Sequence, residues 1–151
     1  MCFVLKRNGD MKRADVIRAA ADACPRASIQ AADKDYAKPT QRYLQGKFYK
    51  AFREYLNEVA ELGYWVAENW DCDDWAAEFR CHASKCHART RRNSGEGIAV
   101  GEVWYTQKKG GGHAINIAIV GGNKVIFIEP QTGKILRLTE GEKCSAWFVR
   151  F

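Results

Sequence analysis

The chain has 151 residues, of which 46% are apolar, 28% are charged and only three are proline. These values are typical of a single globular domain over residues 1–151 and exclude a chain that is mostly disordered. The formal net charge of +6 favours encounter with polyanions, so nucleic acid is a possible partner but not the favoured one. The densest basic run, Arg89, Arg91 and Arg92, has the character of a solvated loop.

The apolar runs are shorter than the roughly 20 residues that a membrane span requires. The beginning of the chain also lacks the apolar stretch of a secretory signal. We therefore expect a cytoplasmic protein without membrane contact. In that setting cysteines are expected to be reduced thiols, metal ligands or a nucleophile rather than disulfides. There are six: Cys2, Cys24, Cys72, Cys81, Cys86 and Cys144.

The first part of the chain predicts one short strand and one helix. Residues 2–6 are apolar enough for a strand or an extended arm. Residues 11–23 are rich in alanine and predict a helix, with Asp10 as its cap and Pro25 at its end. The segment from Pro25 to Pro39 shows little periodicity and is expected to be a loop.

The clearest helix is expected between Thr40, which can cap its start, and Gly63, which can stop it. Apolar side chains recur there at steps of three and four residues, which is the spacing of one buried helix face. We therefore expect this aromatic stripe to face the core rather than to stack on bases. Its members are Leu44, Phe48, Phe52, Tyr55, Leu56, Val59 and Leu62.

A second helix is expected from about residue 73 to residue 88, with Asp71 or Asp73 as the cap. After Arg92 the pattern changes to short β-branched or aromatic runs separated by glycine-rich turns. These runs cover residues 98–107, 113–122, 124–131, 134–139 and 145–151. Helices followed by strands predict an α+β fold, with the N-terminal helices packed on one side of a C-terminal antiparallel meander of four or five strands.

Cys72 begins the second helix within the sequence "NWDCDDWAAEF". Free N–H groups and the dipole at a helix N-terminus stabilise a thiolate and can hold the oxyanion of a tetrahedral intermediate. Asp71, Asp73 and Asp74 oppose this effect, because neighbouring negative charge raises the pKa of a thiol. A catalytic Cys72 would therefore need a cationic histidine as its partner.

His113 is the best candidate for that partner, because it follows three glycines and opens a predicted strand. The next predicted strand ends in Glu129, an ionisable group that closes an apolar run and needs a partner of its own. If the two strands form a hairpin, Glu129 falls beside His113. A carboxylate in that position would orient the imidazole and stabilise its cation.

The segments "DCDDWAAEF", "GGHAINIAI" and "IEPQTG" resemble, in this order, the Cys, His and Asp segments of the transglutaminase-like branch of the papain-like cysteine peptidases. The pattern is also similar to small cysteine-peptidase-like proteins of bacteriophages and prophages. The resemblance implies a papain-like core with Cys72 as nucleophile, His113 as general base and Glu129 as orienting acid. Glu129 departs from the usual aspartate of the family.

The resemblance further implies a cysteine-dependent hydrolase or acyltransferase that acts on an amide, isopeptide or ester through a Cys72 thioester. No cofactor is expected, and the implied partner is a protein or peptide substrate, including a host protein in the host cytoplasm if a phage encodes the chain. Four further residues are weaker candidates for substrate contact. Each could instead be an ordinary turn, strand-edge or core residue. They are Asp73, through its backbone N–H, Asn116, Gln131 and Trp70.

Two alternatives remain open at this point. The sequence "CHASKCH" offers Cys81, Cys86 and His87, with His82 beside them, as ligands of a structural zinc ion. The spacing argues against zinc, because residues five apart on one helix point in different directions. The other alternative is a catalytically silent binding protein on the same fold, with a nucleic acid or a host protein as its partner.

Overall fold

The computed structural model describes residues 10–91 and 94–151. The strand expected at residues 2–6, together with Cys2 and Arg92, lies outside the described residues. Within them, no helix is long and apolar enough to cross a membrane. The expected cytoplasmic location stays a prediction.

The first described elements are a short strand and a helix. Strand β1 (Asp10–Lys12) leads directly into α1 (Arg13–Ala23), whose Val16 and Ala20 are buried. Asp10 was expected to cap this helix but belongs to β1, and Lys12 occupies the cap position without a side-chain hydrogen bond. The predicted helix at residues 11–23 is thus confirmed apart from its first two residues.

The expected loop from Pro25 to Pro39 contains two short strands, β2 (Ser28–Gln30) and β3 (Asp35–Ala37). Their partners are distant in sequence: β2 pairs with the last strand, β9 (Phe148–Arg150), and β3 pairs with β1. A three-residue strand that depends on a remote partner leaves no local period in the sequence, so its sequence alone predicts a loop.

The long amphipathic helix consists of four consecutive helical segments, α2 (Gln41–Tyr43), η1 (Leu44–Phe48), α3 (Tyr49–Glu54) and η2 (Tyr55–Val59). Segments η1 and η2 are π-helical, so each inserts a wider turn. The hydroxyl of Thr40 accepts a hydrogen bond from the N–H of Tyr43, as expected for a cap. The apolar stripe faces the core as predicted except at Val59, which is 73% exposed. The helix ends at Val59 rather than at Gly63.

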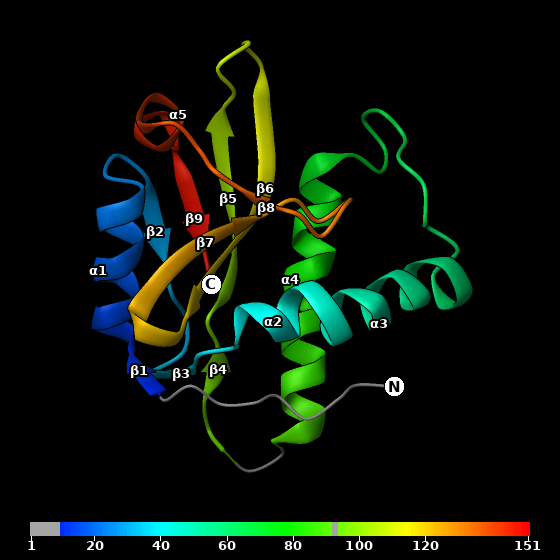
Figure 1. Ribbon diagram of the computed structural model, residues 1–151, viewed down its shortest axis with the longest axis horizontal. Helices are drawn as coiled ribbons and strands as arrows, with labels where there is room; N and C mark the ends of the chain where they lie inside the picture. Colours follow the sequence, from blue (N-terminus) through cyan, green and yellow to red (C-terminus); the bar gives the residue numbers. More distant parts are fainter. Residues whose placement is uncertain (1–9, 92–93) are drawn as a thin grey trace.

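Helix α4 (Cys72–Thr90) confirms the second predicted helix and extends it by one residue at the start and two at the end. Asp71 is its cap, in extended conformation, and the N–H of Asp71 donates to the side chain of Asp74 at 3.3 Å. The loop at 60–71 leaves the long helix and returns to the start of α4, standing away from the rest of the molecule (Figure 1).

The main sheet has six strands in the order β2-β9-β5-β6-β7-β8. Strands β5 (Val100–Thr106), β6 (Gly112–Val120), β7 (Lys124–Ile128) and β8 (Ile135–Leu136) form the expected antiparallel meander, with the short helical turn η3 (Gly121–Asn123) between β6 and β7. The last strand does not continue the meander, because β9 lies between β5 and β2 and pairs in parallel with β2. A smaller sheet joins β1, β3 and β4 (Gly97–Ile98).

Helix α5 (Glu140–Ser145) lies between β8 and β9 along the chain, where the sequence analysis predicts no helix. Thr139 and Glu142 form its capping box: the hydroxyl of Thr139 accepts from the N–H of Glu142, and the Glu142 carboxylate accepts from the N–H of Thr139. This pattern, a threonine followed three residues later by a glutamate, is a helix start signal in the sequence. The expected strand at residues 134–139 is correspondingly shorter.

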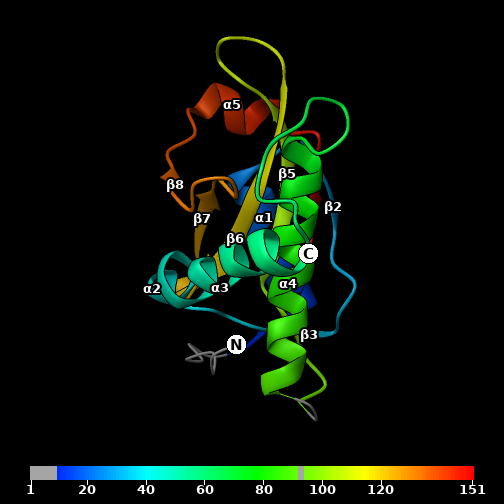
Figure 2. The same ribbon diagram turned by 90° about the vertical axis from the view of Figure 1, so that its right-hand side faces the viewer.

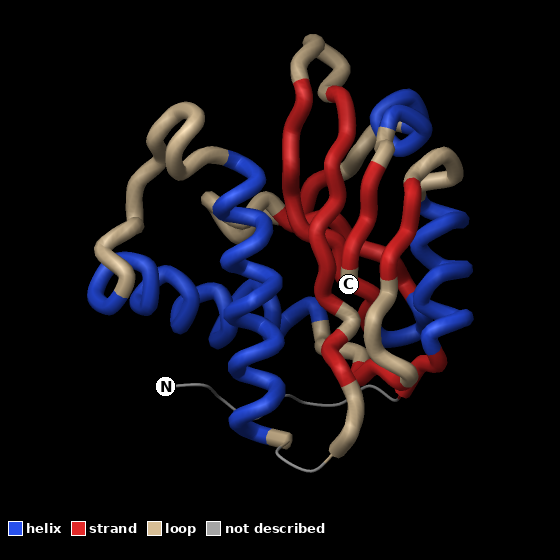
Figure 3. Tube along the Cα trace, turned by 180° about the vertical axis from the view of Figure 1, so that it is seen from behind, coloured by secondary structure: helices blue, strands red, loops and turns tan. Residues whose placement is uncertain are grey.

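Helices cover both faces of the main sheet, rather than one as expected (Figures 1 and 3). Helix α1 packs with Val103, Ile115, Ile117 and Val149 on one face. Helix α4 and the long helix pack with Val100, Ala118 and Ile128 on the other. Alternate side chains of β5 and β6 therefore point to opposite faces of the sheet and belong to two separate apolar cores. The α+β class is confirmed, with a three-layer arrangement in place of two layers. Figure 2 views the molecule from the α4 side, with α4 in front of the sheet.

Candidate functional site

The start of α4 and the start of β6 lie at the same end of the molecule (Figure 1). Cys72 is the first residue of α4, is half-buried and is a free thiol. The backbone N–H of Ala114 donates a hydrogen bond to its sulfur. Because Ala114 follows His113 directly, this contact brings the thiol beside the histidine segment, as the sequence predicted.

Several effects act on the pKa of the Cys72 thiol, and together they raise it above its ordinary value. Burial is the largest, followed among the raising effects by the negative charges of Asp71 and Asp73. The hydrogen bond from Ala114 acts in the opposite direction, because it stabilises the thiolate. The expectation that neighbouring aspartates would oppose ionisation is therefore confirmed for Asp71 and Asp73.

Asp71 and Asp73 interact directly with each other through their side chains. This contact raises the pKa of Asp73 to about 6 and lowers that of Asp71, because the two carboxyl groups share a proton more readily than they ionise together. Asp73 is thus part of the electrostatic surroundings of Cys72. Its predicted contact with a ligand stays a prediction.

His113 and Glu129 are in contact, as expected from the predicted hairpin. The Nε2 atom of His113 lies 2.9 Å from Oε2 of Glu129, and each side chain is 16% exposed. His113 is the second residue of β6, and Glu129 follows the last residue of β7. The β6–β7 pairing places Ile128 opposite Asn116, which sets the carboxylate beside the histidine.

A tight turn holds Glu129 in position. Its backbone N–H donates to the carbonyl of Lys134 at 2.9 Å, and its carbonyl accepts from Gly133 at 2.8 Å. The N–H of Gln131 donates to Oε1 of Glu129 at 3.4 Å, while the hydroxyl of Tyr49 donates to the carbonyl of Gln131 at 2.7 Å. Gln131 therefore supports Glu129 through its backbone, and its expected side-chain contact with a ligand stays a prediction.

Asn116 is fully buried and joins α4 to the sheet. Its Nδ2 donates to the carbonyl of Ala76 at 2.8 Å and to that of Gly101 at 2.9 Å. These two bonds fix the spacing between helix and strand on which the approach of Cys72 to Ala114 depends. With no exposed surface, Asn116 positions the site from beneath rather than contacting a ligand.

Trp70 fixes the loop that leads into Cys72. Its Nε1 donates to the carbonyl of Leu62 at 2.8 Å, and its ring lies 6.2 Å from that of Trp75. Trp75 belongs to the core, whereas Trp65 is 54% exposed. The three tryptophans near Cys72 thus have different environments, and the expected contact of Trp70 with a ligand stays a prediction.

Two residues next to the site were missed from the sequence. Tyr105 lies opposite His113 in the β5–β6 pair, with ring centroids 5.9 Å apart. Trp147 is 44% exposed and lies beside Gly112, 3.4 Å from where a Cβ atom would stand. The register of β5 and β6 could have indicated Tyr105. Trp147 precedes β9 directly and is brought to the site by the pairing of β9 with β5, which no local sequence pattern reveals.

The alternative zinc site is not assembled. Cys86 is disulfide-bonded, contrary to the expectation of reduced thiols, and Nε2 of His87 lies 3.1 Å from the carbonyl of Glu96. His82 is buried among the rings of Phe48, Phe52 and Tyr55. Over residues 10–91 and 94–151, the one group of potential metal ligands that converge is Asp71, Cys72 and Asp73.

The family described as "Agglutinin C-terminal" matches residues 46–135, which is more than half of the chain and includes Cys72, His113 and Glu129. No curated protein has a significantly similar sequence. Two similar solved structures extend the comparison to the whole fold.

One is described as "PSL1a-E64 complex", with a TM-score of 0.75 and 25% identity, covering 94% of this chain and 51% of the other. The other is Polyporus squamosus lectin, described as bound to the human-type influenza-binding epitope Neu5Acα2-6Galβ1-4GlcNAc. It has a TM-score of 0.73 and 24% identity, covering 94% of this chain and 49% of the other. The chain thus spans about half the length of these two proteins.

These comparisons correct the functional expectations. The predicted membership of the transglutaminase-like cysteine peptidases is wrong, because the family that matches is an agglutinin domain. The predicted hydrolase or acyltransferase is corrected by the same match, because the family is an agglutinin domain, and one of the two similar structures is a lectin described as bound to a glycan epitope. The expected partners are corrected as well: the similar structures hold a glycan epitope or a small ligand, not a protein substrate or nucleic acid.

Proposed function

Because the chain belongs to the agglutinin C-terminal family, we propose that it is a domain of a carbohydrate-binding protein. The family match over residues 46–135 carries this proposal. The solved lectin with a sialylated epitope supports it, since that protein shares the fold over 94% of the present chain. The proposal assigns glycan binding to this chain itself, although it spans only about half of the lectin.

Glycan binding is tested by isothermal titration of the purified chain with Neu5Acα2-6Galβ1-4GlcNAc and with neutral Galβ1-4GlcNAc. We expect saturable binding of at least one of them, and an array of diverse glycans extends the search to other sugars. A chain that binds neither compound and no glycan on the array would contradict the proposal.

A second candidate function is the capture of a small ligand at the Cys72 site. The observation that favours it is the contact of Cys72 with Ala114 next to the His113–Glu129 pair. In this arrangement His113 takes the thiol proton and Glu129 orients the imidazole, so that the sulfur becomes nucleophilic. The similar structure in complex with E64 supports a ligand site in this fold.

This site at the start of a helix, with partners on two adjacent strands, is also the arrangement of a papain-like core. That finer description of the fold stays a prediction. The capture proposal concerns ligand binding and thiol reactivity alone, and it includes no turnover of a substrate.

Thiol reactivity is tested by mass spectrometry after brief treatment with limiting iodoacetamide at neutral pH. The Cys72 sulfur displaces iodide and forms a C–S bond while the thiol proton passes to His113. We expect Cys72 to be labelled before the other free thiols of the described residues, Cys24, Cys81 and Cys144. His113→Ala should slow Cys72 and leave Cys81, on the same helix, unchanged. Uniform slow labelling of all four would contradict the proposal, and a parallel incubation with E64 tests ligand capture.

A further inference from the structure

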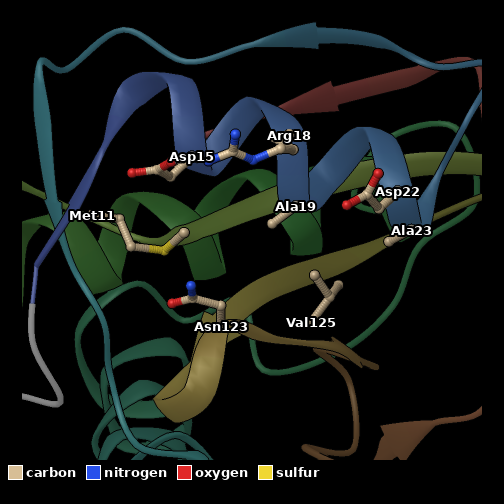
Figure 4. Close-up of a pocket in the computed structure, with 8 residues that line it drawn as sticks. All are labelled: Met11, Asp15, Arg18, Ala19, Asp22, Ala23, Asn123 and Val125. Carbon is tan, nitrogen blue, oxygen red and sulfur yellow. Dashed lines mark hydrogen bonds and ion pairs between the residues drawn. The ribbon is translucent and has the colours of Figure 1, made fainter.

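Two thiols that are distant in the sequence, Cys24 and Cys144, lie at the same end of the molecule. Cys24 directly follows Ala23, the last residue of α1, which Figure 4 shows at the end of that helix farthest from Met11. Cys144 belongs to the last turn of α5, and α5 lies at the end of the molecule where α1 ends (Figures 1 and 3). Both cysteines are free thiols.

The register of the main sheet brings the two thiols together. The parallel pairing of β2 with β9 places Ser28 opposite Phe148. Cys24 precedes Ser28 by four residues, and Cys144 precedes Phe148 by the same number. The N–H of Ser28 donates to the carbonyl of Trp147 at 2.9 Å, so the two segments already lie side by side where they enter the strands. The cysteines therefore occupy equivalent positions ahead of a paired couple of parallel strands.

Two neighbouring residues of α5 act electrostatically on the Cys24 thiol. Burial is the largest effect and raises the pKa of Cys24 to about 11. The positive charge of Lys143 lowers this pKa, and the negative charge of a Cys144 thiolate raises it. Because such effects weaken with distance, Lys143 and Cys144 both lie close to the Cys24 sulfur. Ala146, two residues beyond Cys144, also packs in the same apolar core as Cys24.

We propose that Cys24 and Cys144 form a reversible disulfide when the chain meets a low-molecular-weight disulfide such as glutathione disulfide. Neighbouring strands lie about 4.8 Å apart and the Cα atoms of a disulfide about 5.5 Å apart, so two segments that enter paired strands together suit a bridge. Cys86 is disulfide-bonded, so the chain already forms a disulfide elsewhere. The new bridge belongs neither to the proposed glycan binding nor to the Cys72 site.

Exposure decides which of the two thiols reacts first. Cys144 is half-buried, so its thiolate attacks one sulfur of glutathione disulfide, forms a mixed disulfide and releases one glutathione thiolate. Cys24 has no exposed surface and reacts second. Its sulfur attacks the Cys144 sulfur and displaces the second glutathione, while its proton passes to the departing thiolate. Two protein thiols are thus oxidised, and one glutathione disulfide is reduced to two molecules of glutathione. The proximity of the two sulfurs offsets the low reactivity of a buried thiol.

The bridge joins α1 to α5 and, through α5, to the end of β5. The N–H of Thr106 donates to Oγ of Ser145 at 3.0 Å, and this hydroxyl donates to the carbonyl of Thr106 at 3.0 Å. The ring that the bridge closes contains most of the described chain, so it removes more entropy from the unfolded state than a short ring does. Oxidation of Cys24 and Cys144 therefore stabilises the folded protein.

Peptide mass spectrometry of the full chain after incubation with glutathione disulfide at pH 8, with the remaining thiols alkylated before digestion, tests the proposal. We expect a disulfide-linked pair of peptides that contain Cys24 and Cys144, and reduced glutathione should separate them again. Cys24→Ala should leave a stable glutathione adduct on Cys144, because the second thiol is missing, and Cys144→Ser should leave Cys24 reduced. Cys81→Ser removes a free thiol of α4, is the matched control and should form the bridge like the wild type.

Thermal unfolding provides a second readout. The bridged wild type should unfold at a midpoint higher by on the order of 5 °C than the untreated protein, and Cys24→Ala should show no such rise. The proposal is overturned by a glutathione adduct that persists on Cys144 in the wild type, by two thiols that stay free, or by a bridge from Cys24 to a different cysteine. A bridge that leaves the midpoint unchanged would overturn its stabilising effect on the fold.

Discussion

The Nε2 atom of His113 lies 2.9 Å from Oε2 of Glu129, so the imidazole is held by a carboxylate from the neighbouring strand. Tyr105 packs against the same ring from the other neighbouring strand. The ring is therefore fixed from both sides, while the Ala114 N–H next to it holds the Cys72 sulfur.

Glu129→Gln retains the size of the side chain and removes its negative charge. Because the neutral amide stabilises the imidazolium less, Cys72 should react with iodoacetamide more slowly at pH 7, by on the order of tenfold. Mass spectrometry of the labelled peptide measures the rate. Glu140→Gln, an exposed change on α5, is the control and should leave the rate unchanged. An unaltered rate in Glu129→Gln would show that Glu129 does not act on the thiol.

Asp73→Asn should have the opposite effect on Cys72. The negative charge of Asp73 contributes to the raised pKa of the thiol, so its removal should lower that pKa and increase the thiolate fraction near neutral pH. We expect the midpoint of the labelling rate against pH to move to lower pH. Glu78→Gln, further along α4, serves as the control. A midpoint that stays in place would contradict the electrostatic role of Asp73.

His82 should make the stability of the fold depend on pH. Burial is the largest cause that lowers the pKa of His82, from 6.5 to about 4. The unfolded chain then takes up the proton first as the pH falls. The folded state therefore has its full stability above pH 6.5 and loses it as the pH falls toward 4, by about 2 to 3 kcal/mol at pH 4.5.

Urea unfolding at pH 7 and pH 4.5 measures this loss against that of His82→Phe, whose ring lies equally well among Phe48, Phe52 and Tyr55 but does not titrate. Carboxyl groups titrate in the same range in both proteins, so the difference between them isolates His82. Equal losses in the two proteins would refute the prediction.

Asn116 should tolerate no acidic replacement. In Asn116→Asp an oxygen replaces the nitrogen that donates to the carbonyls of Ala76 and Gly101, so both hydrogen bonds are lost. The new carboxyl group must also be buried, either as a charge or in its protonated form. We expect a decrease in the free energy of unfolding of about 3 kcal/mol or more, and a smaller decrease for Asn116→Leu. Urea unfolding at pH 7 ranks the two variants. The reverse order would show that the two hydrogen bonds contribute little.

Gly101 should be sensitive to the smallest possible side chain. A Cβ atom there would lie 2.4 Å from the carbonyl oxygen of Arg150 on β9, and this neighbour is backbone that cannot rotate away. Gly101→Ala should lower the free energy of unfolding by about 2 kcal/mol. Gly46→Ala, in the long helix, is the matched control, because a Cβ there meets nothing within 4 Å. Thermal unfolding compares them, and equal midpoints would contradict the prediction.

The sequence predicted those elements whose signals are local. The long helix and α4 show an apolar period and cap residues, and Thr40 and Asp71 occupy the predicted cap positions. The pairing of β6 with β7 followed from the two apolar runs and the glycine turn between them, and it placed Glu129 beside His113. These parts of the structure depend on contacts between residues that are close along the chain.

The remaining features depend on contacts that the sequence does not display. Strands β2 and β3 are too short to show a period and exist because of distant partners. The resemblance to the transglutaminase-like cysteine peptidases rests on the order of a cysteine, a histidine and an acid. That order predicts which side chains meet, but it does not determine the family or the function of the domain.

The place of β9 between β2 and β5 has a consequence for how the protein folds. Residues 28–30 and 148–150 must meet before the main sheet is complete, and these segments lie near opposite ends of the described chain. Closing so long a loop costs entropy before the contacts repay it, which slows folding. During synthesis β5 can pair with β6 but has an open edge until β9 emerges. Premature termination within β9 would therefore leave two unpaired strand edges and favour aggregation.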